Sequence, residues 1–289
     1  MAIYQTLNDS IHKIRVLHIL PQRAFKASDQ TQGQVECLLE YVSLNNSPFY
    51  HALSYTWQLP DSDVPFADRE SVTRNEDSGV DIILDGNVVS VTFNLWSALK
   101  QFQYLLYMEG ESEMFPRETR LWVDAICINQ LEFSERNTQV RQMRQIYQKA
   151  RCVNAWLGPE ASNSSAAMEF AKIYNNHVRN NGLQGKESLN RKSKLRQLMN
   201  QLLKHSHVSE APKDSIGDKW IAQGLKDPAS GPSWIALAAL YGRSYWRRVW
   251  IVQEIISNST TWVHCGGSAM SLTTLLGLGE RCVDIVGDD

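Results

Sequence analysis

Three groups of polar residues could do chemistry in this chain, and each lies inside or at the end of an apolar segment. The first is Ser54-Tyr55-Thr56-Trp57, which closes the short run HALSYTW. A serine, a tyrosine and a tryptophan at the carboxyl edge of a sheet can hydrogen-bond and stack a flat ring. The alternative is that Tyr55 and Trp57 are core aromatic residues whose polar tips find partners within the protein.

The second group is Asp124 with Asn129 and Gln130, in the run LWVDAICINQ. Asp124 is an acid within an apolar, strand-like segment, and burying a carboxylate is costly unless it is paired or hydrogen-bonded. We therefore expect Asp124 to have a partner. It could belong to a ligand site, because open α/β sheets bind ligands at the carboxyl ends of their strands. The alternative is a structural pair that tethers a loop or a helix end.

The third group is centred on Glu254, in the segment YWRRVWIVQEIIS. No cation lies three or four residues from Glu254, so we expect no salt bridge within the helix. The neighbouring Gln253 shares a helix face with Trp246 and Trp250, which places the acid on the shoulder of an aromatic stripe. Glu254 is then either anchored by an arginine from elsewhere or turned into a cleft. In a cleft it could stabilise positive charge or polarise a hydroxyl group.

Several other mechanisms are not indicated. The sequence has no phosphate-binding G-x-x-x-x-G-K-[ST] loop, no G-x-G-x-x-G, no H-E-x-x-H and no G-x-S-x-G. His205 and His207 have no cysteine or acid at metal-ligand spacing, and the adjacent His264 and Cys265 face opposite sides of a strand. We therefore expect no metal site.

Composition limits the class of protein. The chain has 289 residues, of which 43% are hydrophobic, and a net charge of -2, which suits one large domain or one domain with an insert. This charge argues against a nucleic-acid partner. The N-terminal residues show no secretory signal and no apolar run reaches the ~20 residues of a membrane span. We therefore predict a cytoplasmic protein without a membrane role. Its odd number of cysteines predicts reduced, mostly buried thiols: Cys37, Cys127, Cys152, Cys265 and Cys282.

The elements that position these residues can be read from periodicity. Residues 120–158 predict a strand carrying Asp124, an amphipathic helix from about Ser134, and a second strand. The long crossover predicts a parallel pair, and hence an α/β fold with a central, mostly parallel sheet flanked by helices. Residues 80–91 predict a β-hairpin around Asp85-Gly86-Asn87, and residues 94–107 a helix with Asn94 as its N-cap.

The remaining elements are less informative. Strands are expected at residues 14–20, 51–57 and 260–265, and residues 35–44 could be a strand or a short helix. Residues 59–80 predict an acidic loop. Residues 159–232 read as an insert with helices at 162–178 and 191–205. The second of these is basic, and it either binds an acidic partner or an anionic membrane, or packs on the core. Further helices are expected at 233–239 and, capped by Ser244, at 245–257.

Four segments together resemble a known family, the fungal heterokaryon incompatibility (HET) domain. In order, they are HALSYTW, LDGNVVSVTFNLWSAL, LWVDAICINQLEFSERNTQVRQMRQIYQKARCVNAWLG and YWRRVWIVQEI. The resemblance runs from about residue 50 to about residue 267 and is interrupted at 159–232. One departure is Gln58, where the family usually has glycine. The resemblance implies a single domain over residues 1–289 that acts in non-self recognition and programmed cell death.

The HET family also looks distantly similar to Toll/interleukin-1-receptor (TIR) domains, which implies a TIR- or flavodoxin-like sheet. In TIR domains that cleave NAD, a helix glutamate is catalytic, and Glu254 is the matching residue. The implied reaction is hydrolysis of the bond between nicotinamide and ribose, with NAD as substrate and no resident cofactor. The implied substrate-binding residues are Ser54, Tyr55, Trp57, Asp124, Asn129, Gln130 and Trp250. The alternative is a non-catalytic death-signalling module that acts by self-association or through a partner protein.

Overall fold

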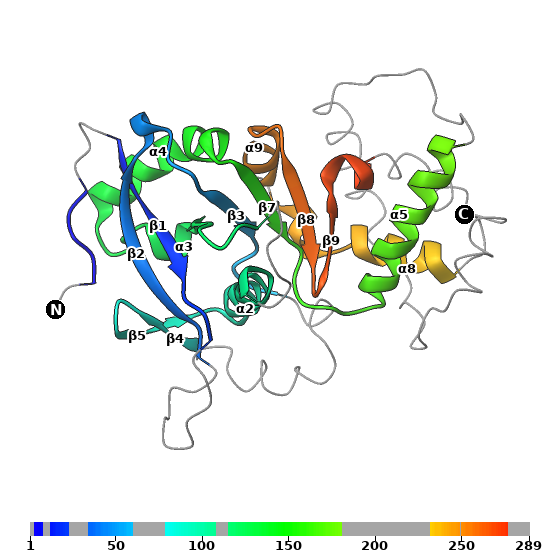
Figure 1. Ribbon diagram of the computed structural model, residues 1–289, viewed down its shortest axis with the longest axis horizontal. Helices are drawn as coiled ribbons and strands as arrows, with labels where there is room; N and C mark the ends of the chain where they lie inside the picture. Colours follow the sequence, from blue (N-terminus) through cyan, green and yellow to red (C-terminus); the bar gives the residue numbers. More distant parts are fainter. Residues whose placement is uncertain are drawn as a thin grey trace. The chain divides into compact units, whose positions relative to one another are not determined.

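The computed structural model describes residues 3–7, 12–22, 34–59, 79–107, 115–180, 232–248 and 250–276 (Figure 1). The nine strands among these residues are hydrogen-bonded in the order β5-β4-β2-β1-β6-β3-β7-β8-β9. The chain divides into two compact units. Unit 1 comprises Met1–Gln58, Glu70–Asn154 and Gln253–Thr260, and unit 2 comprises Leu59–Arg69, Ala155–Val252 and Thr261–Asp289.

Unit 1 contains most of the strands. They are β1 (Lys13–Ile19), β2 (Glu36–Ser43), β3 (His51–Tyr55), β4 (Val80–Leu84), β5 (Asn87–Val91), β6 (Leu121–Trp122) and the first part of β7 (Cys152–Trp156). β2 is antiparallel to β1 and parallel to β4. Residues 35–44, which could have been a strand or a short helix, therefore contain a strand. A short 3-10 helix, η2 (Leu44–Asn46), follows it. β6 pairs antiparallel with β1 and parallel with β3.

The predicted hairpin is confirmed. β4 and β5 pair antiparallel and are joined by Asp85 and Gly86, both in the left-handed region with φ angles of 48° and 76°. Glycine adopts such angles without strain and aspartate tolerates them, which is why this turn could be predicted from sequence. The Asp85 carboxylate also accepts a hydrogen bond of 3.1 Å from the backbone N–H of Leu39 in β2, which ties the turn to the sheet.

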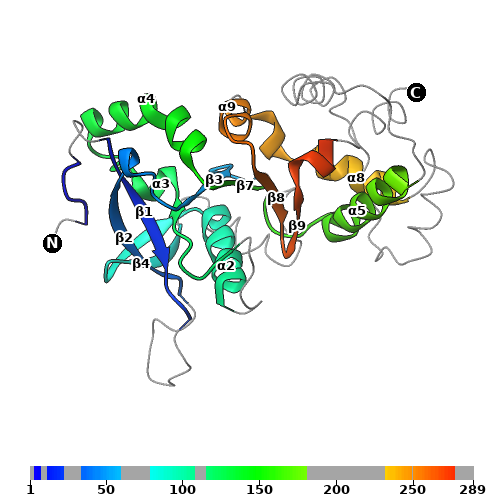
Figure 2. The same cartoon turned by 45° about the horizontal axis from the view of Figure 1, so that its top comes forward.

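Helices of unit 1 cover the sheet. α2 (Phe93–Tyr107) buries the apolar face predicted from its spacing, and α4 (Phe133–Lys149) begins within one residue of the predicted start. All five residues of β3 are buried, as expected for a strand covered on both faces. Figure 2 shows α4 and α2 on either side of the strands of unit 1. In the core, the rings of Trp122 and Tyr147 meet edge to face at 5.4 Å.

The predicted N-cap of α2 is wrong by two residues. The hydroxyl of Thr92, and not the side chain of Asn94, accepts the hydrogen bond from the backbone N–H of Leu95, at 3.3 Å. Asn94 is buried and donates instead to the carbonyl and the hydroxyl of Thr56, at 2.6 and 3.0 Å. Threonine is also a favourable N-cap, so local propensity alone could not separate the two candidates.

The prediction of a mostly parallel sheet is wrong, because the sheet is mixed and mostly antiparallel. The pairs β1–β2, β1–β6, β4–β5 and β8–β9 are antiparallel, whereas β2–β4 and β3–β6 are parallel. The strand–helix–strand argument treated β6 and β7 as neighbours, but β3 lies between them. The α/β class is confirmed, and the TIR- or flavodoxin-like topology and the single domain stay predictions.

Unit 2 contains α5 (Ser164–Asn180), α8 (Pro232–Tyr241), the 3-10 helix η4 (Ser244–Arg247), β8 (Thr261–Cys265) and β9 (Ser268–Ser271), with the end of β7 and the start of α9 (Ile251–Ile256). The prediction of a single helix at 245–257 is wrong, because two short helices, η4 and α9, occupy this region. Arg248 is extended, with φ −75° and ψ 131°, and separates η4 from α9. β9 was not predicted; it follows a turn in which Gly266 has a φ of 54°.

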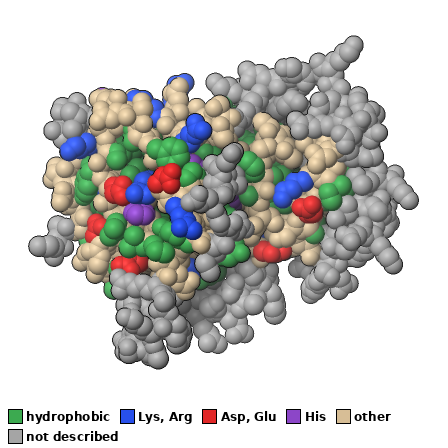
Figure 3. Space-filling view, in the orientation of Figure 1, with side chains coloured by type: hydrophobic (Ala, Val, Ile, Leu, Met, Phe, Trp, Pro, Cys, Tyr) green, Lys and Arg blue, Asp and Glu red, His purple; other side chains and the backbone are tan. Residues whose placement is uncertain are grey.

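Some predictions concern parts of the chain beyond the described residues. These are the basic helix at 191–205, most of the acidic loop at 59–80, and Cys282. The four described cysteines are buried. None of the described helices is both long and apolar enough to cross a bilayer. On the face of unit 1 in Figure 3, acidic and basic side chains are interspersed rather than segregated.

Candidate functional site

The structure brings Ser54 and Glu254 together, although 200 positions of sequence separate them. Ser54 is the second-last residue of β3, and its hydroxyl donates to the carboxylate of Glu254 at 2.5 Å. Both residues belong to unit 1, and their side chains are 1% and 2% exposed. A buried carboxylate is favourable only when hydrogen bonds replace its water, and this serine supplies one of them.

The aromatic residues beside Ser54 differ in exposure. Tyr55 is 2% exposed and belongs to the core of unit 1, which agrees with the structural alternative for this residue. Trp57, just beyond the strand, is 48% exposed, and its indole N–H lies 3.4 Å from the carboxylate of Asp124. Trp57 is therefore the ring of this group that a flat ligand could reach.

Asp124 is not inside a strand, contrary to the prediction. β6 ends at Trp122, and Asp124 opens the short helix α3 (Asp124–Cys127). There its carboxylate accepts a hydrogen bond of 2.7 Å from the backbone N–H of Ala125 as well as the contact with Trp57. An acid in the first turn of a helix is electrostatically favourable.

Two residues hold the loop after α3: Gln130, which the sequence singled out, and Glu135, which it did not. The side chain of Gln130 donates to the backbone carbonyl of Asp124 at 2.9 Å, so Asp124 restrains the loop through its main chain. The backbone N–H of Asn129 donates to the carboxylate of Glu135 at 2.7 Å. Glu135 in turn pairs with Arg15. The signal was present: Arg15 is a lone charge in the apolar run IRVLHI, as Asp124 is in its own run.

Trp250 and Arg243 belong to unit 2. Trp250 is 58% exposed and precedes α9. Arg243, a buried arginine near Glu254 in the sequence, donates to the backbone carbonyls of Leu157, Pro159 and Ala161. Its described contacts are therefore those of a structural cation that caps carbonyl groups within unit 2.

Comparison with known proteins now identifies the family. The sequence model of the family described as "Heterokaryon incompatibility protein (HET)" matches residues 50–254, most of the chain. The chain belongs to the HET family. A relative from Neurospora crassa, "Heterokaryon incompatibility protein 6, OR allele", is 26% identical over 285 residues, which cover 96% of this chain and 37% of that protein. The HET chain described here thus spans little more than a third of that relative. No solved structure matches it.

The residues that match the HET family model include the candidate site. The match begins at Tyr50, directly before β3, and ends at Glu254, so both members of the Ser54–Glu254 pair fall within it. Chemically, a carboxylate that accepts from a serine hydroxyl can polarise that hydroxyl or stabilise a developing positive charge. Among the residues that the structure describes, no cluster of three or more histidine, cysteine or acidic side chains is arranged to hold a metal ion.

Proposed function

We propose that this HET-family chain acts in heterokaryon incompatibility, the fungal response in which recognition of non-self ends in cell death. The family match and the relative named for heterokaryon incompatibility support this role. Because the chain spans only 37% of that relative, the activity and partners of a complete protein are part of the proposal. Self-association or binding of a death-signalling protein would provide the trigger, and the cytoplasm would be the site of action.

For the chemistry, we propose hydrolysis of an NAD-type dinucleotide with Glu254 as the catalytic residue. The observation that carries the proposal is the hydrogen bond between Ser54 and Glu254. The bond between C1′ of the ribose and nicotinamide breaks, nicotinamide leaves as a neutral base with the bonding electrons, and water forms the new C1′–O bond and releases a proton. The transition state has oxocarbenium character, which a carboxylate stabilises.

The neighbouring residues suit the binding of a dinucleotide. The exposed ring of Trp57 could stack on the nicotinamide or adenine ring, and its hydrogen bond to Asp124 fixes the plane of the indole. Ser54 would orient the Glu254 carboxylate toward the ribose. Tyr55 would support the strand from the core, and Asn129 and Gln130 would form the loop beside Asp124. Trp250, an exposed ring of unit 2, stays a predicted substrate-binding residue. The resemblance to TIR domains adds to this proposal by analogy.

A second function is favoured by the burial of the pair. Glu254 is 2% exposed, so a substrate reaches its carboxylate only after the residues that cover it move. If no such movement occurs, the Ser54–Glu254 hydrogen bond is a structural tie, and the domain is an assembly module without catalysis. The two functions differ in what they demand of Glu254: catalysis needs its charge in an opened state, whereas assembly needs only the closed state.

The test is nicotinamide release from NAD by the purified chain, measured at high protein concentration with and without a crowding agent. Wild type should release nicotinamide, and Glu254→Gln, which keeps the size of the side chain, should lower the rate about 100-fold or more. The matched control is Glu40→Gln, because Glu40 is a carboxylate of unit 1 that is 40% exposed and paired with Arg120 at 2.8 Å. This control should retain the wild-type rate.

Two results would reject the hydrolase. One is an inactive wild type under conditions where light scattering shows self-association, which supports the assembly module instead. The other is a folded Glu254→Gln variant with the wild-type rate. Ser54→Ala separates orientation from charge: it should lower kcat while retaining more activity than Glu254→Gln.

A further inference from the structure

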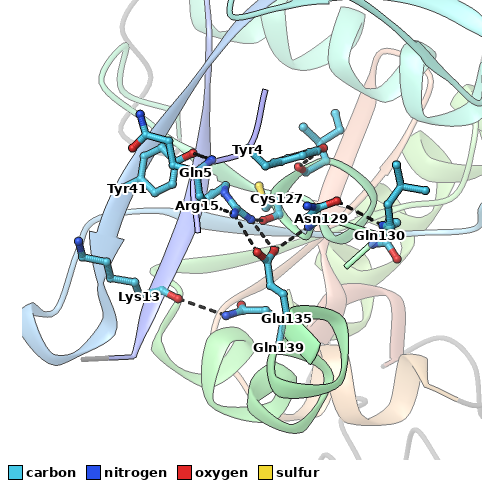
Figure 4. A network of polar contacts seen from close by, with 12 residues as sticks. Tyr4, Gln5, Lys13, Arg15, Tyr41, Cys127, Asn129, Gln130, Glu135 and Gln139 are labelled. Atoms are coloured by element: carbon cyan, nitrogen blue, oxygen red, sulfur yellow. Dashed lines mark hydrogen bonds and ion pairs between the residues drawn. The ribbon is translucent and has the colours of Figure 1, made fainter. Parts of the chain in front are cut away.

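A buried ion pair links β1 to α4 in unit 1. Arg15 in β1 is 0% exposed, and its guanidinium makes two hydrogen bonds with the carboxylate of Glu135 in α4, at 2.5 and 2.9 Å (Figure 4). This two-pronged geometry is the strongest arrangement of an arginine with a carboxylate. A buried pair is stabilised further by hydrogen bonds to its other donors and acceptors. The two terminal nitrogens of Arg15 have such partners, whereas its Nε has none among the described residues.

Those remaining bonds lead to the loop of the candidate site. Arg15 donates to the backbone carbonyl of Cys127, the last residue of α3, at 3.1 Å. The Oε1 atom of Glu135, which accepts a hydrogen bond from Nη1 of Arg15, also accepts one of 2.7 Å from the backbone N–H of Asn129 (Figure 4). One ion pair therefore fixes the main chain on both sides of Ile128. This is the segment that starts at Asp124 and ends at Gln130.

Residues 3–7 close over the ion pair. Arg15 donates to the carbonyl of Gln5 at 2.6 Å, and the Gln5 N–H donates to the hydroxyl of Tyr41 at 3.0 Å. The rings of Tyr4 and Tyr41 lie 4.9 and 5.4 Å from the guanidinium carbon of Arg15, within the range of cation–π attraction.

Tyr4 also reaches α3 directly, because its hydroxyl donates to the carbonyl of Ile126 at 3.0 Å (Figure 4). Burial, followed by the nearby Cys127, raises the pKa of Tyr4 to about 12, so this hydroxyl keeps its proton at neutral pH. The N-terminal segment is thus fastened to the same helix end that Arg15 holds.

We propose that Glu135 and Arg15 are positioning residues for the segment from Asp124 to Gln130, and that residues 3–7 are a latch that keeps them in place. Replacing the Glu135 carboxylate by a neutral amide deprives Arg15 of its counter-charge and gives the Asn129 N–H a weaker acceptor. Removing the Tyr4 hydroxyl loosens α3 from the other side. The link between residues 3–7 and the segment from Asp124 to Gln130 is argued from these contacts alone. Only the role of that segment in binding a dinucleotide rests on the proposed function.

The test is amide hydrogen exchange, followed at residues 126–131, for wild type, Glu135→Gln and Tyr4→Phe. Exchange there should become about tenfold faster or more in Glu135→Gln, because a hydrogen bond to a charged group is lost, and about fivefold faster in Tyr4→Phe. Exchange in the hairpin β4–β5 should stay at the wild-type rate. Glu40→Gln, which removes a carboxylate from a half-exposed ion pair of the same unit, should change neither region.

Local and global effects are distinguishable. A merely structural role would speed exchange in the hairpin as much as in the loop, and that result would overturn the proposal. Wild-type exchange at 126–131 in a folded Glu135→Gln variant would also overturn it. If Glu135→Gln does not fold, Tyr4→Phe decides alone, because it removes one oxygen and keeps the ring. Failure of wild type to cleave NAD would reject the proposed chemistry and leave these outcomes unaffected.

Discussion

His51 should make the stability of unit 1 depend on pH. It is the first residue of β3 and is 2% exposed. Its Nδ1 lies 3.3 Å from the side-chain nitrogen of Asn154, which can only donate, so Nδ1 must accept and the neutral ring carries its proton on Nε2. Phe115 lies edge-on at 5.1 Å. Burial, together with the charge of Arg151, lowers the pKa of His51 from 6.5 to about 4.

The lowered pKa of His51 makes the free energy of unfolding depend on pH. As the pH falls below 6.5, the unfolded chain binds a proton at this histidine, whereas the native chain does so only near pH 4. The free energy of unfolding is therefore highest above pH 6.5 and falls between these two values. At 1.36 kcal/mol per pKa unit, the loss from this residue is about 2 kcal/mol at about pH 5 and about 3 kcal/mol near the native pKa.

The assay is urea unfolding at about pH 7.5 and about pH 5, followed by tryptophan fluorescence, for wild type and His51→Gln. Glutamine can accept the hydrogen bond from Asn154 but does not titrate. Wild type should lose about 2 kcal/mol more than the variant between the two pH values. The control His18→Gln removes a histidine that is 24% exposed, and it should keep most of the wild-type pH dependence. Equal pH dependence of wild type and His51→Gln would refute the reasoning.

Two further predictions concern stability, and both are measured by urea unfolding. Gly266→Ala should cost about 2 kcal/mol or more, because φ is +54° and the added Cβ would lie 2.7 Å from the Cβ of Glu160. Gly86→Ala is its control: φ is +76° but nothing lies within 4 Å, so only the backbone cost of about 1 kcal/mol is expected, and equal losses would contradict the argument. Asn94→Ala should cost about 1–3 kcal/mol, because it removes both donors to Thr56; a loss below the measurement error would show that the buried carbonyl finds another partner.

The parts of the fold that sequence predicts well are those with local causes. The β4–β5 hairpin follows from Asp85 and Gly86, and the helix α2 follows from apolar residues at helical spacing. The arrangement of strands has no such local cause. Where β3 lies in the sheet depends on contacts such as the hydroxyl of Tyr147 with the carbonyl of Leu53, which lie 94 residues apart.

The same distinction applies to the candidate site. The resemblance and the aromatic stripe singled out Glu254, but only the structure shows its hydrogen bond to Ser54. Asp124 was assigned to a strand because its neighbours are apolar, although an acid also suits the first turn of a helix. Glu135 was missed because a charge near the start of an amphipathic helix ordinarily faces water. Its partner Arg15 is 120 positions away.

Each unit contains a buried cysteine whose alkylation measures how often that unit opens. Burial raises the pKa of Cys37, and that of Cys127 to about 12, so at neutral pH almost no thiolate is present to attack an alkylating reagent. Both belong to unit 1, and the buried Cys265 belongs to unit 2. Alkylation of these sulfur atoms under native conditions therefore proceeds through transiently opened molecules, and mass spectrometry of the labelled peptides times the opening of each unit separately.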